Sequence, residues 1–393
     1  KGAIDIARHY TLFGSGVETF AYSYYQFRPV EHNQTSEWDF LYNKAHNEYL
    51  NYLANTGFVG LGAYLLMIGW FLFLSLKQFK IQNSKLEKEK LHFALIAGYI
   101  SILVSNFFGF SVVVVNLFFF LIPALVFVLN GQLNPKQSFV LQIPSKTIRI
   151  TNYELRIMNI LITLILFSIF YFLSSIYMMW GADRDFATAK NLDRSGEFVE
   201  AYSFLASAIK MRSGEPLFSE EFSINTSNLA IAALETNDAT LSSDLIKEAV
   251  AQSNYTIKKS PNNPGFWRTR VRVFYTLGQI DEKYNEEALD SAKRASELSP
   301  TDPKIGYNYG LLLGQTGKLS EAIKELERTV ALKPDYRDPI YALGLFYHEK
   351  ATEQKGTVNQ EYLNKAIAQM ESVLNLASED AEAKEKLKEW RGF

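Results

Sequence analysis

The chain has 393 residues and a nearly balanced charge, with 40 Lys and Arg against 42 Asp and Glu and a formal net charge of −2 at pH 7. This balance gives no basis for nucleic-acid binding, and we expect no nucleic-acid partner. The sequence has no cysteine, which excludes a disulfide framework and thiol chemistry. A chain of this length is expected to contain two or three domains.

Residues 1–56 form a polar, aromatic-rich segment that leads into the first apolar run at Gly57. His46 and Asn47 lie just ahead of that run. Polar groups at the boundary of a membrane are costly to keep there, so this cluster is a candidate functional site. Asn is also favoured at the start of a helix, so a simple capping role for Asn47 stays open.

Four apolar runs are predicted to cross a membrane, because about 20 helical residues at 1.5 Å each span a hydrocarbon core of about 30 Å. The predicted spans are residues 57–76, 92–110, 112–129 and 157–180. Two segments rich in Lys and Arg, 77–90 and 131–156, separate them, and basic loops favour the cytoplasmic side. Residues 1–56 and 181–393 are therefore expected on the outer face, with lipids around the spans.

Residues 181–393 are predicted to form an array of about five helix pairs. Residues 304–336 match the tetratricopeptide pattern of about 34 residues, with Gly310 and Ala322 at small positions and Pro334 ending the unit. We expect the periodic apolar residues to be core, the terminal helix 378–393 to be a polar cap, and the concave face to bind a protein partner. The candidates on that face are Arg268, Tyr307, Asn308 and Tyr341.

The predicted fold class is therefore all-α, a multi-spanning membrane helix bundle followed by a tetratricopeptide α-solenoid. The predicted domains are the outer segment 1–56, the four spans within 57–180, and the repeat array 181–393.

The first half of the chain resembles a known family. His46-Asn47, nine residues, and then Gly57-x-x-Gly60 resemble the end of the large outer loop in the O-antigen ligase and O-antigen polymerase superfamily. Arg8-x-x-x-Leu12 resembles the arginine motif of that loop, and residues 14–20 fit its glycine-rich stretch. An appended tetratricopeptide array also recurs in this superfamily. The resemblance covers roughly residues 1–180.

The resemblance implies a GT-C-like enzyme that transfers a glycan from undecaprenyl diphosphate to a lipid or protein acceptor outside the cytoplasmic membrane. It implies inversion at the sugar, with no metal ion and no cofactor. Ligases, glycan polymerases and protein O-oligosaccharyltransferases all belong to the superfamily, and these alternatives stay open. We expect further spans before residue 1, so that this chain alone is inactive. A different alternative is a membrane-anchored tetratricopeptide scaffold without chemistry.

Within the resemblance, two chemical needs assign candidate residues. A departing diphosphate gains negative charge, which arginine can meet, so Arg8 is the first candidate and Arg28 the next. The acceptor must lose a proton and be aimed, which suits the imidazole of His46 as base or as orienting partner. Asn47 and Glu48 are expected to hold that ring or contact acceptor sugar. Arg8 can equally be a solvated surface residue.

The remaining candidates in this segment have less specific roles. Glu18 is either a ligand for the acceptor or a solvated charge. The aromatic residues Trp38, Tyr42 and Tyr49 either stack on sugar faces or lie at the lipid interface. Gly57 and Gly60 are expected where helices approach closely.

Overall fold

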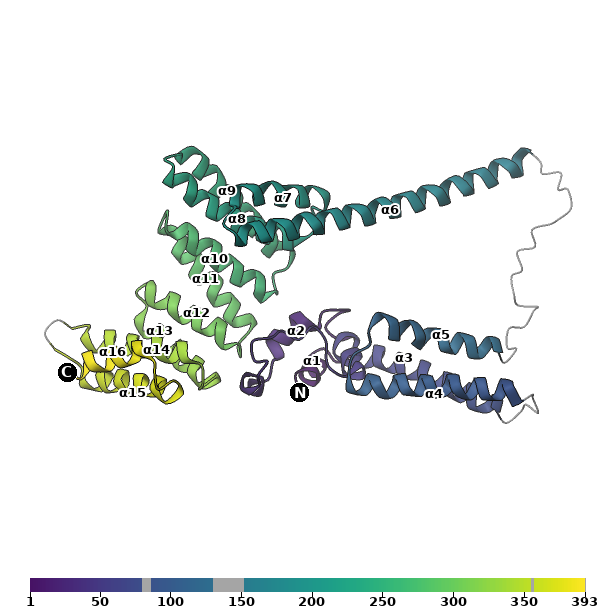
Figure 1. The fold of residues 1–393 in the computed structure, drawn as a ribbon, viewed down its shortest axis with the longest axis horizontal. Helices are drawn as coiled ribbons and strands as arrows, with labels where there is room; N and C mark the ends of the chain where they lie inside the picture. The colour runs from purple at the N-terminus through teal and green to yellow at the C-terminus, as the bar shows by residue number, and fades with distance from the viewer. Residues whose placement is uncertain (80–85, 130–151, 355–356, 393) are drawn as a thin grey trace. The chain divides into compact units, whose positions relative to one another are not determined.

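The structure is a computed structural model that describes residues 1–79, 86–129, 152–354 and 357–392. Every regular element in this part of the chain is a helix (Figure 1), which confirms the all-α prediction. The chain divides into two compact units. Unit 1 comprises Lys1–Pro29 and Phe40–Arg149, and unit 2 comprises Val30–Asp39 and Ile150–Phe393.

In the described part of unit 1, two short helices are followed by three longer apolar ones. These are α1 (Gly2–His9), α2 (Phe20–Phe27), α3 (Glu48–Phe79), α4 (Leu86–Phe108) and α5 (Val113–Leu129). Stacked aromatic rings fill the space between the long helices. The ring of Phe119 lies 5.3 Å from that of Tyr64 and 5.2 Å from that of Tyr99. All three residues are buried, and aromatic rings supply large buried area at this junction.

The predicted spans 57–76, 92–110 and 112–129 correspond to α3, α4 and α5, although α4 already ends at Phe108 and α5 begins only at Val113. Helices α3 and α4 are long and apolar enough to cross a membrane, whereas α5 has 17 residues and is shorter. That these helices lie in a membrane stays a prediction. Most of the basic segments that set the predicted orientation fall outside the described residues, at 80–85 and 130–151.

Unit 2 begins with the short 3-10 helix η1 (Val30–Gln34) and continues at the 43-residue helix α6 (Asn152–Arg194). The predicted fourth span, 157–180, and the first helix of the array are one uninterrupted helix, so no helix end corresponds to the predicted boundary at 181. The apolar side chains from Ile160 to Trp180 are largely exposed, and this helix is also long and apolar enough to cross a membrane.

The end of α6 starts an array of helix pairs (Figure 1), as the repeat pattern predicts. The further helices are α7 (Phe198–Met211), α8 (Pro216–Glu235), α9 (Ala239–Lys259), α10 (Pro264–Gly278), α11 (Lys283–Leu298), α12 (Pro303–Gln315), α13 (Leu319–Leu332), α14 (Arg337–Thr352), α15 (Gln360–Leu376) and α16 (Ala381–Trp390). Close approach within pairs explains the small residues. A Cβ on Gly310 would lie 2.8 Å from the Leu326 side chain, and one on Gly344 would lie 2.5 Å from Met370.

Two pairs of adjacent residues show which positions of α8 and α10 face the core. Ala233 and Phe266 are buried, whereas their neighbours Ala232 and Trp267 are only half-buried. The indole N–H of Trp267 donates to the carbonyl oxygen of Pro261 at 2.8 Å. An indole N–H needs an acceptor, and the turn before α10 supplies one at the surface, so phenylalanine takes the core position instead.

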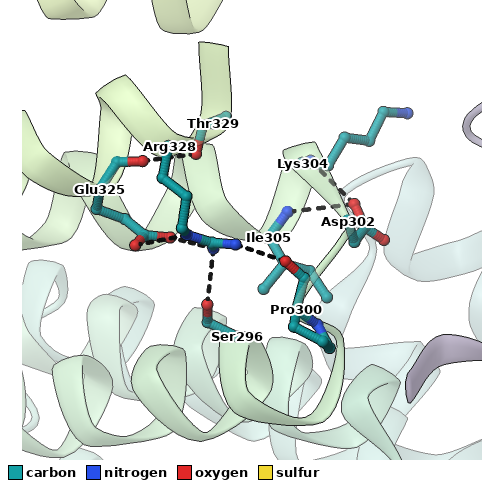
Figure 2. Close-up of polar contacts among 8 residues, drawn as sticks. All are labelled: Ser296, Pro300, Asp302, Lys304, Ile305, Glu325, Arg328 and Thr329. Carbon is teal, nitrogen blue, oxygen red and sulfur yellow. Dashed lines mark hydrogen bonds and ion pairs between the residues drawn. The ribbon is translucent and has the colours of Figure 1, made fainter. Parts of the chain in front are cut away.

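The turn between α11 and α12 is held from both sides (Figure 2). Arg328 on α13 donates to the carbonyl oxygen of Pro300 and to the hydroxyl of Ser296, at 3.2 Å for the latter. Asp302 caps α12, accepting from the backbone N–H of Lys304 at 2.9 Å. A capped helix start and a clamped turn fix the spacing between successive repeats.

Candidate functional sites

The glycine-rich stretch of unit 1 is locked to a break in α3. At Gly57 the backbone has φ 64° and ψ −166°, which interrupts the helix. Four backbone hydrogen bonds connect the two segments. They run from the N–H of Ser15 to Ala54 O (2.9 Å), of Gly16 to Asn55 O (3.0 Å), of Phe58 to Thr11 O (3.0 Å) and of Val59 to Leu12 O (3.1 Å). The loop therefore satisfies backbone groups that the break leaves open.

Only glycine fits on either side of this contact. A Cβ on Gly57 would lie 2.4 Å from the carbonyl carbon of Leu12, and one on Gly14 would lie 2.3 Å from that of Asn55. Both glycines have positive φ. The close approach predicted for Gly57 is thus to a loop rather than to another helix. At Gly60 the nearest group is the Thr56 side chain of the same helix.

His46 lies at a small cavity of unit 1. Its exposed ring lies 5.3 Å from that of Tyr42 and 5.5 Å from that of Phe110. The cavity has a volume of about 220 Å³. Its charged lining residues, among those the structure describes, are Lys1, Lys44 and the titratable His46, with no carboxylate. Such a lining favours an anionic ligand.

Asn47 and Glu48 fasten the start of α3. The side-chain oxygen of Asn47 accepts from the N–H of Leu50 at 2.9 Å, which is the capping geometry left open by the sequence. Its amide donates to Phe107 O at 2.8 Å. The buried Glu48 accepts from the N–H of Ser111 at 3.0 Å. Both residues tie α3 to the turn between α4 and α5, and their predicted contacts with acceptor sugar stay predictions.

The other predicted site residues lie apart from the lining of this cavity. Arg8 is on the exposed face of α1, with a side chain 77% exposed and paired with Asp5 at 3.2 Å. Glu18 pairs with Lys44 at 3.2 Å at the surface. Arg28 is buried at the end of α2. Burial raises the pKa of the nearby Tyr24, and the positive charge of Arg28 has a smaller effect in the opposite direction. The structure thus brings His46 and Asn47 together at the cavity, but not Arg8. Their roles stay predictions.

Lys44 and Tyr24 line the cavity without having been selected from the sequence. No motif marks either residue, and the only available signal was the closeness of Lys44 to His46 along the chain. The ring of Tyr24 lies 5.8 Å from that of Tyr42, so the cavity has an aromatic wall.

A larger cavity, the array groove, lies in unit 2 and has a volume of about 580 Å³. Helices α8, α10 and α12, the first helices of three successive pairs, supply most of its lining. Arg268, Arg272 and Tyr275 are exposed there, and Asn308 and Gln315 add amides. Two of the four predicted candidates, Arg268 and Asn308, therefore line it.

The other two array candidates are engaged elsewhere. The ring of Tyr307 lies 5.8 Å from that of Tyr336, and Tyr341 lies under the guanidinium of Arg337 at 4.4 Å. Neither residue lines the groove.

Glu220 is the carboxyl group of the groove lining. Burial raises the pKa of Glu220 to about 7, although the hydrogen bond that its carboxylate accepts from the Thr269 hydroxyl lowers it in part. A carboxyl group that titrates near neutral pH can donate or accept a hydrogen bond with a ligand. The groove therefore combines two exposed cations with one half-buried, protonatable group.

Comparisons with known proteins concern the array. No protein-family model matches the chain. Small glutamine-rich tetratricopeptide repeat-containing protein 2 of Mycosarcoma maydis is 32% identical over 89 residues, which are 22% of this chain and 23% of that protein. The match thus spans less than a quarter of the relative's length.

Solved structures of repeat proteins cover about half of this chain. The tetratricopeptide protein TTC0263 of Thermus thermophilus is 17% identical with a TM-score of 0.36, over 54% of this chain and 100% of that one. MamA of Desulfovibrio magneticus RS-1 is 19% identical with a TM-score of 0.38, over 51% and 98%. These low scores add nothing to the helix pairs and the repeat period found in the chain itself. Residues from the end of α6 to α16 form a tetratricopeptide-type array of helix pairs.

Proposed function

We propose that the chain is a membrane-anchored scaffold whose array binds an extended polypeptide segment of a partner protein. The observation that carries the proposal is the array groove, which spans three successive helix pairs. Leu311 and Leu312 give it apolar surface, and the guanidinium groups of Arg268 and Arg272 are exposed beside it. Arginine pairs strongly with carboxylate, so a segment carrying acidic side chains fits best.

A photo-crosslinking amino acid tests this proposal in cells that carry the full-length protein. Placed at Tyr275, which lines the groove and is 44% exposed, it is expected to give discrete protein adducts. Placed at Val199 on α7, which is 73% exposed and is not a lining residue, it serves as the matched control. Replacing Arg268 and Arg272 by alanine should reduce the adducts at least about tenfold, since charge-assisted contacts dominate. Equal adducts at both positions, or no response to the arginine changes, would refute groove binding.

We propose that α3, α4, α5 and α6 cross the cytoplasmic membrane, with residues 1–56 and the array outside. The length and apolar composition of α3, α4 and α6 and the apolar composition of the shorter α5 support the anchoring, and the Lys and Arg bias of the loops supports the orientation. The chain has no cysteine, so a single introduced cysteine reports its own exposure. In spheroplasts, a membrane-impermeant maleimide should label Ser195→Cys and spare Ser84→Cys. Labelling of Ser84→Cys from outside would overturn the orientation.

A second candidate function is glycan transfer from undecaprenyl diphosphate, of the kind implied by the resemblance. The cavity at His46 favours it, because the cationic lining suits a diphosphate and an imidazole suits an acceptor hydroxyl. In this proposal Lys44 supplies positive charge at the cavity. The prediction for Arg8 requires its guanidinium to leave Asp5 and reach the diphosphate. Ligation, polymerisation and protein glycosylation all remain within this proposal.

Glycan transfer by the full-length protein separates the two functions. His46→Ala should lower the rate at least about a hundredfold if the imidazole acts as base. His9→Ala is the matched control, because His9 is an exposed histidine on α1 and is not a lining residue. Parental transfer in the His46 variant would remove the enzymatic site assignment and leave the scaffold proposal intact.

A further inference from the structure

A segment near the start of the chain packs against the array within unit 2. Residues Val30–Asp39 contact two successive inter-repeat turns, 299–304 and 332–336, which we call the turn pair. The segment and the first of these contacts are 268 residues apart in sequence. Neither the repeat pattern nor the loop motifs indicate this contact.

Asn33 is the central residue of the contact and is fully buried. Its side-chain amide donates to the carbonyl oxygen of Thr301 at 2.9 Å and to that of Leu332 at 3.2 Å. An amide nitrogen has two N–H donors, and both are used here. The two carbonyls belong to successive repeats. The Asn33 amide can therefore reach both of them only when the two repeats are stacked at the observed spacing.

Lys333 contributes a buried ammonium group from the array. Its side chain is 6% exposed, and Nζ donates to Asn33 O at 2.8 Å and to Asp335 at 2.8 Å. The hydrogen bond from Lys333 to Asp335 lowers the pKa of the Asp335 carboxyl group. A buried charge without partners is costly, and the segment supplies one of the two hydrogen-bond acceptors.

The indole ring of Trp38 lies between two ammonium groups of the array. Its ring lies 4.7 Å from the ammonium of Lys333 and 5.0 Å from that of Lys304, and 5.2 Å from the ring of Tyr336. Lys304 also pairs with Asp39 at 3.0 Å. Ammonium groups are attracted to the face of an indole, so the array's charges and the segment's aromatic and acidic groups are complementary. The alternative roles expected for Trp38, sugar stacking and the lipid interface, do not match this position.

The segment is also held in shape by its own contacts. The hydroxyl of Thr35 donates to His32 O at 2.8 Å, and the buried His32 ring lies 3.1 Å from Glu37 O. On the array side, the clamp of Arg328 and the cap of Asp302 fix the first turn (Figure 2). Two preformed surfaces lose little conformational freedom when they meet.

We propose that the turn pair is a recognition site for the chain's own segment Val30–Asp39. The segment contributes the buried amide of Asn33 and the indole of Trp38, and the array contributes two backbone carbonyl groups and the ammonium groups of Lys333 and Lys304. Pro29 and Phe40, which flank the segment in sequence, belong to unit 1. The array then has two interaction surfaces, the groove for a partner and the turn pair for the chain itself. This inference is independent of the proposed function.

Hydrogen–deuterium exchange on the full-length protein in lipid nanodiscs tests the proposal. Lys333→Met keeps the aliphatic stem and removes the donors, and Asn33→Ala removes the amide from the segment side. Each should raise the exchange rate of amides 30–39 at least about tenfold, because a buried hydrogen-bonded group loses its partner. The matched controls are Lys324→Met, exposed on α13, and Asn43→Ala, exposed outside the segment.

The two variants separate recognition from damage to the array. Faster exchange in Asn33→Ala with unchanged exchange in α12 and α13 supports the proposal, since that change leaves the array sequence intact. Unchanged exchange of residues 30–39 in Asn33→Ala overturns it, whatever Lys333→Met does. Equal acceleration by Lys324→Met or Asn43→Ala also overturns it, because neither residue takes part in the contacts.

Discussion

Gly57→Ala is expected to be among the most damaging methyl additions in unit 1. The backbone at Gly57 has φ 64° and ψ −166°, a region that is essentially restricted to glycine and costs other residues about 1–3 kcal/mol. The added Cβ would also lie 2.4 Å from Leu12 backbone atoms, which cannot swing aside as a side chain can. The only way for the variant to avoid this strain is to adopt helical backbone angles at residue 57, which would straighten α3. This would gain about 1 kcal/mol of helix propensity. It would also break four backbone hydrogen bonds worth about 0.5–1.5 kcal/mol each.

Both routes predict a loss of about 1–5 kcal/mol, together with loss of protection at the amides of Ser15, Gly16, Phe58 and Val59. The assay is hydrogen–deuterium exchange combined with thermal unfolding of the full-length protein in detergent. Gly62→Ala is the matched control, because it adds the same methyl group to the same helix with no atom within 4 Å. If Gly57→Ala matches Gly62→Ala in stability and protection, the account of the break as a locked junction is wrong.

The array allows three further predictions, each measured by chemical unfolding of the full chain. The folded-state pKa of Glu220 is raised to about 7, so its folded form holds a proton that the unfolded form releases between pH 4.5 and 7. Stability should therefore fall as pH rises through this window, by at most about 3 kcal/mol, and Glu220→Gln should abolish the dependence. Asp302→Ala should cost about 1 kcal/mol through loss of the α12 cap, whereas the exposed Asp290→Ala should be neutral. Leu326→Ala, at a fully buried position, should cost about 2–5 kcal/mol, far more than Leu376→Ala at a 46% exposed one.

The repeat array could be predicted from sequence because its signals are local. Gly310, Ala322 and Pro334 recur at positions where one helix must approach another or end, and each is explained by contacts within its own repeat. Hydrophobic periodicity does not say which of two adjacent apolar residues is buried, so the burial of Ala233 and Phe266 rather than Ala232 and Trp267 could not be read from the sequence.

The contacts between distant segments could not be predicted in the same way. Asn33 and Trp38 belong to no repeat and no recognised motif, yet they lie against turns almost 300 residues away. Nothing in the local sequence encodes such a pairing, because the complementarity exists only after the turns have been placed side by side. The same holds for Lys44, whose place at the cavity depends on how residues 40–50 fold.

The continuity of α6 changes what an anchored array can do. A flexible linker would let the repeats move independently of the proposed span, but α6 runs from Asn152 to Arg194 without a break and is itself the first helix of the array. Farther along the array, Lys304 contacts the docked segment while Asn308, one turn later on α12, lines the groove. Residues four apart lie on the same face of a helix. The partner proposed for the groove and the docked segment therefore contact the same helix, α12.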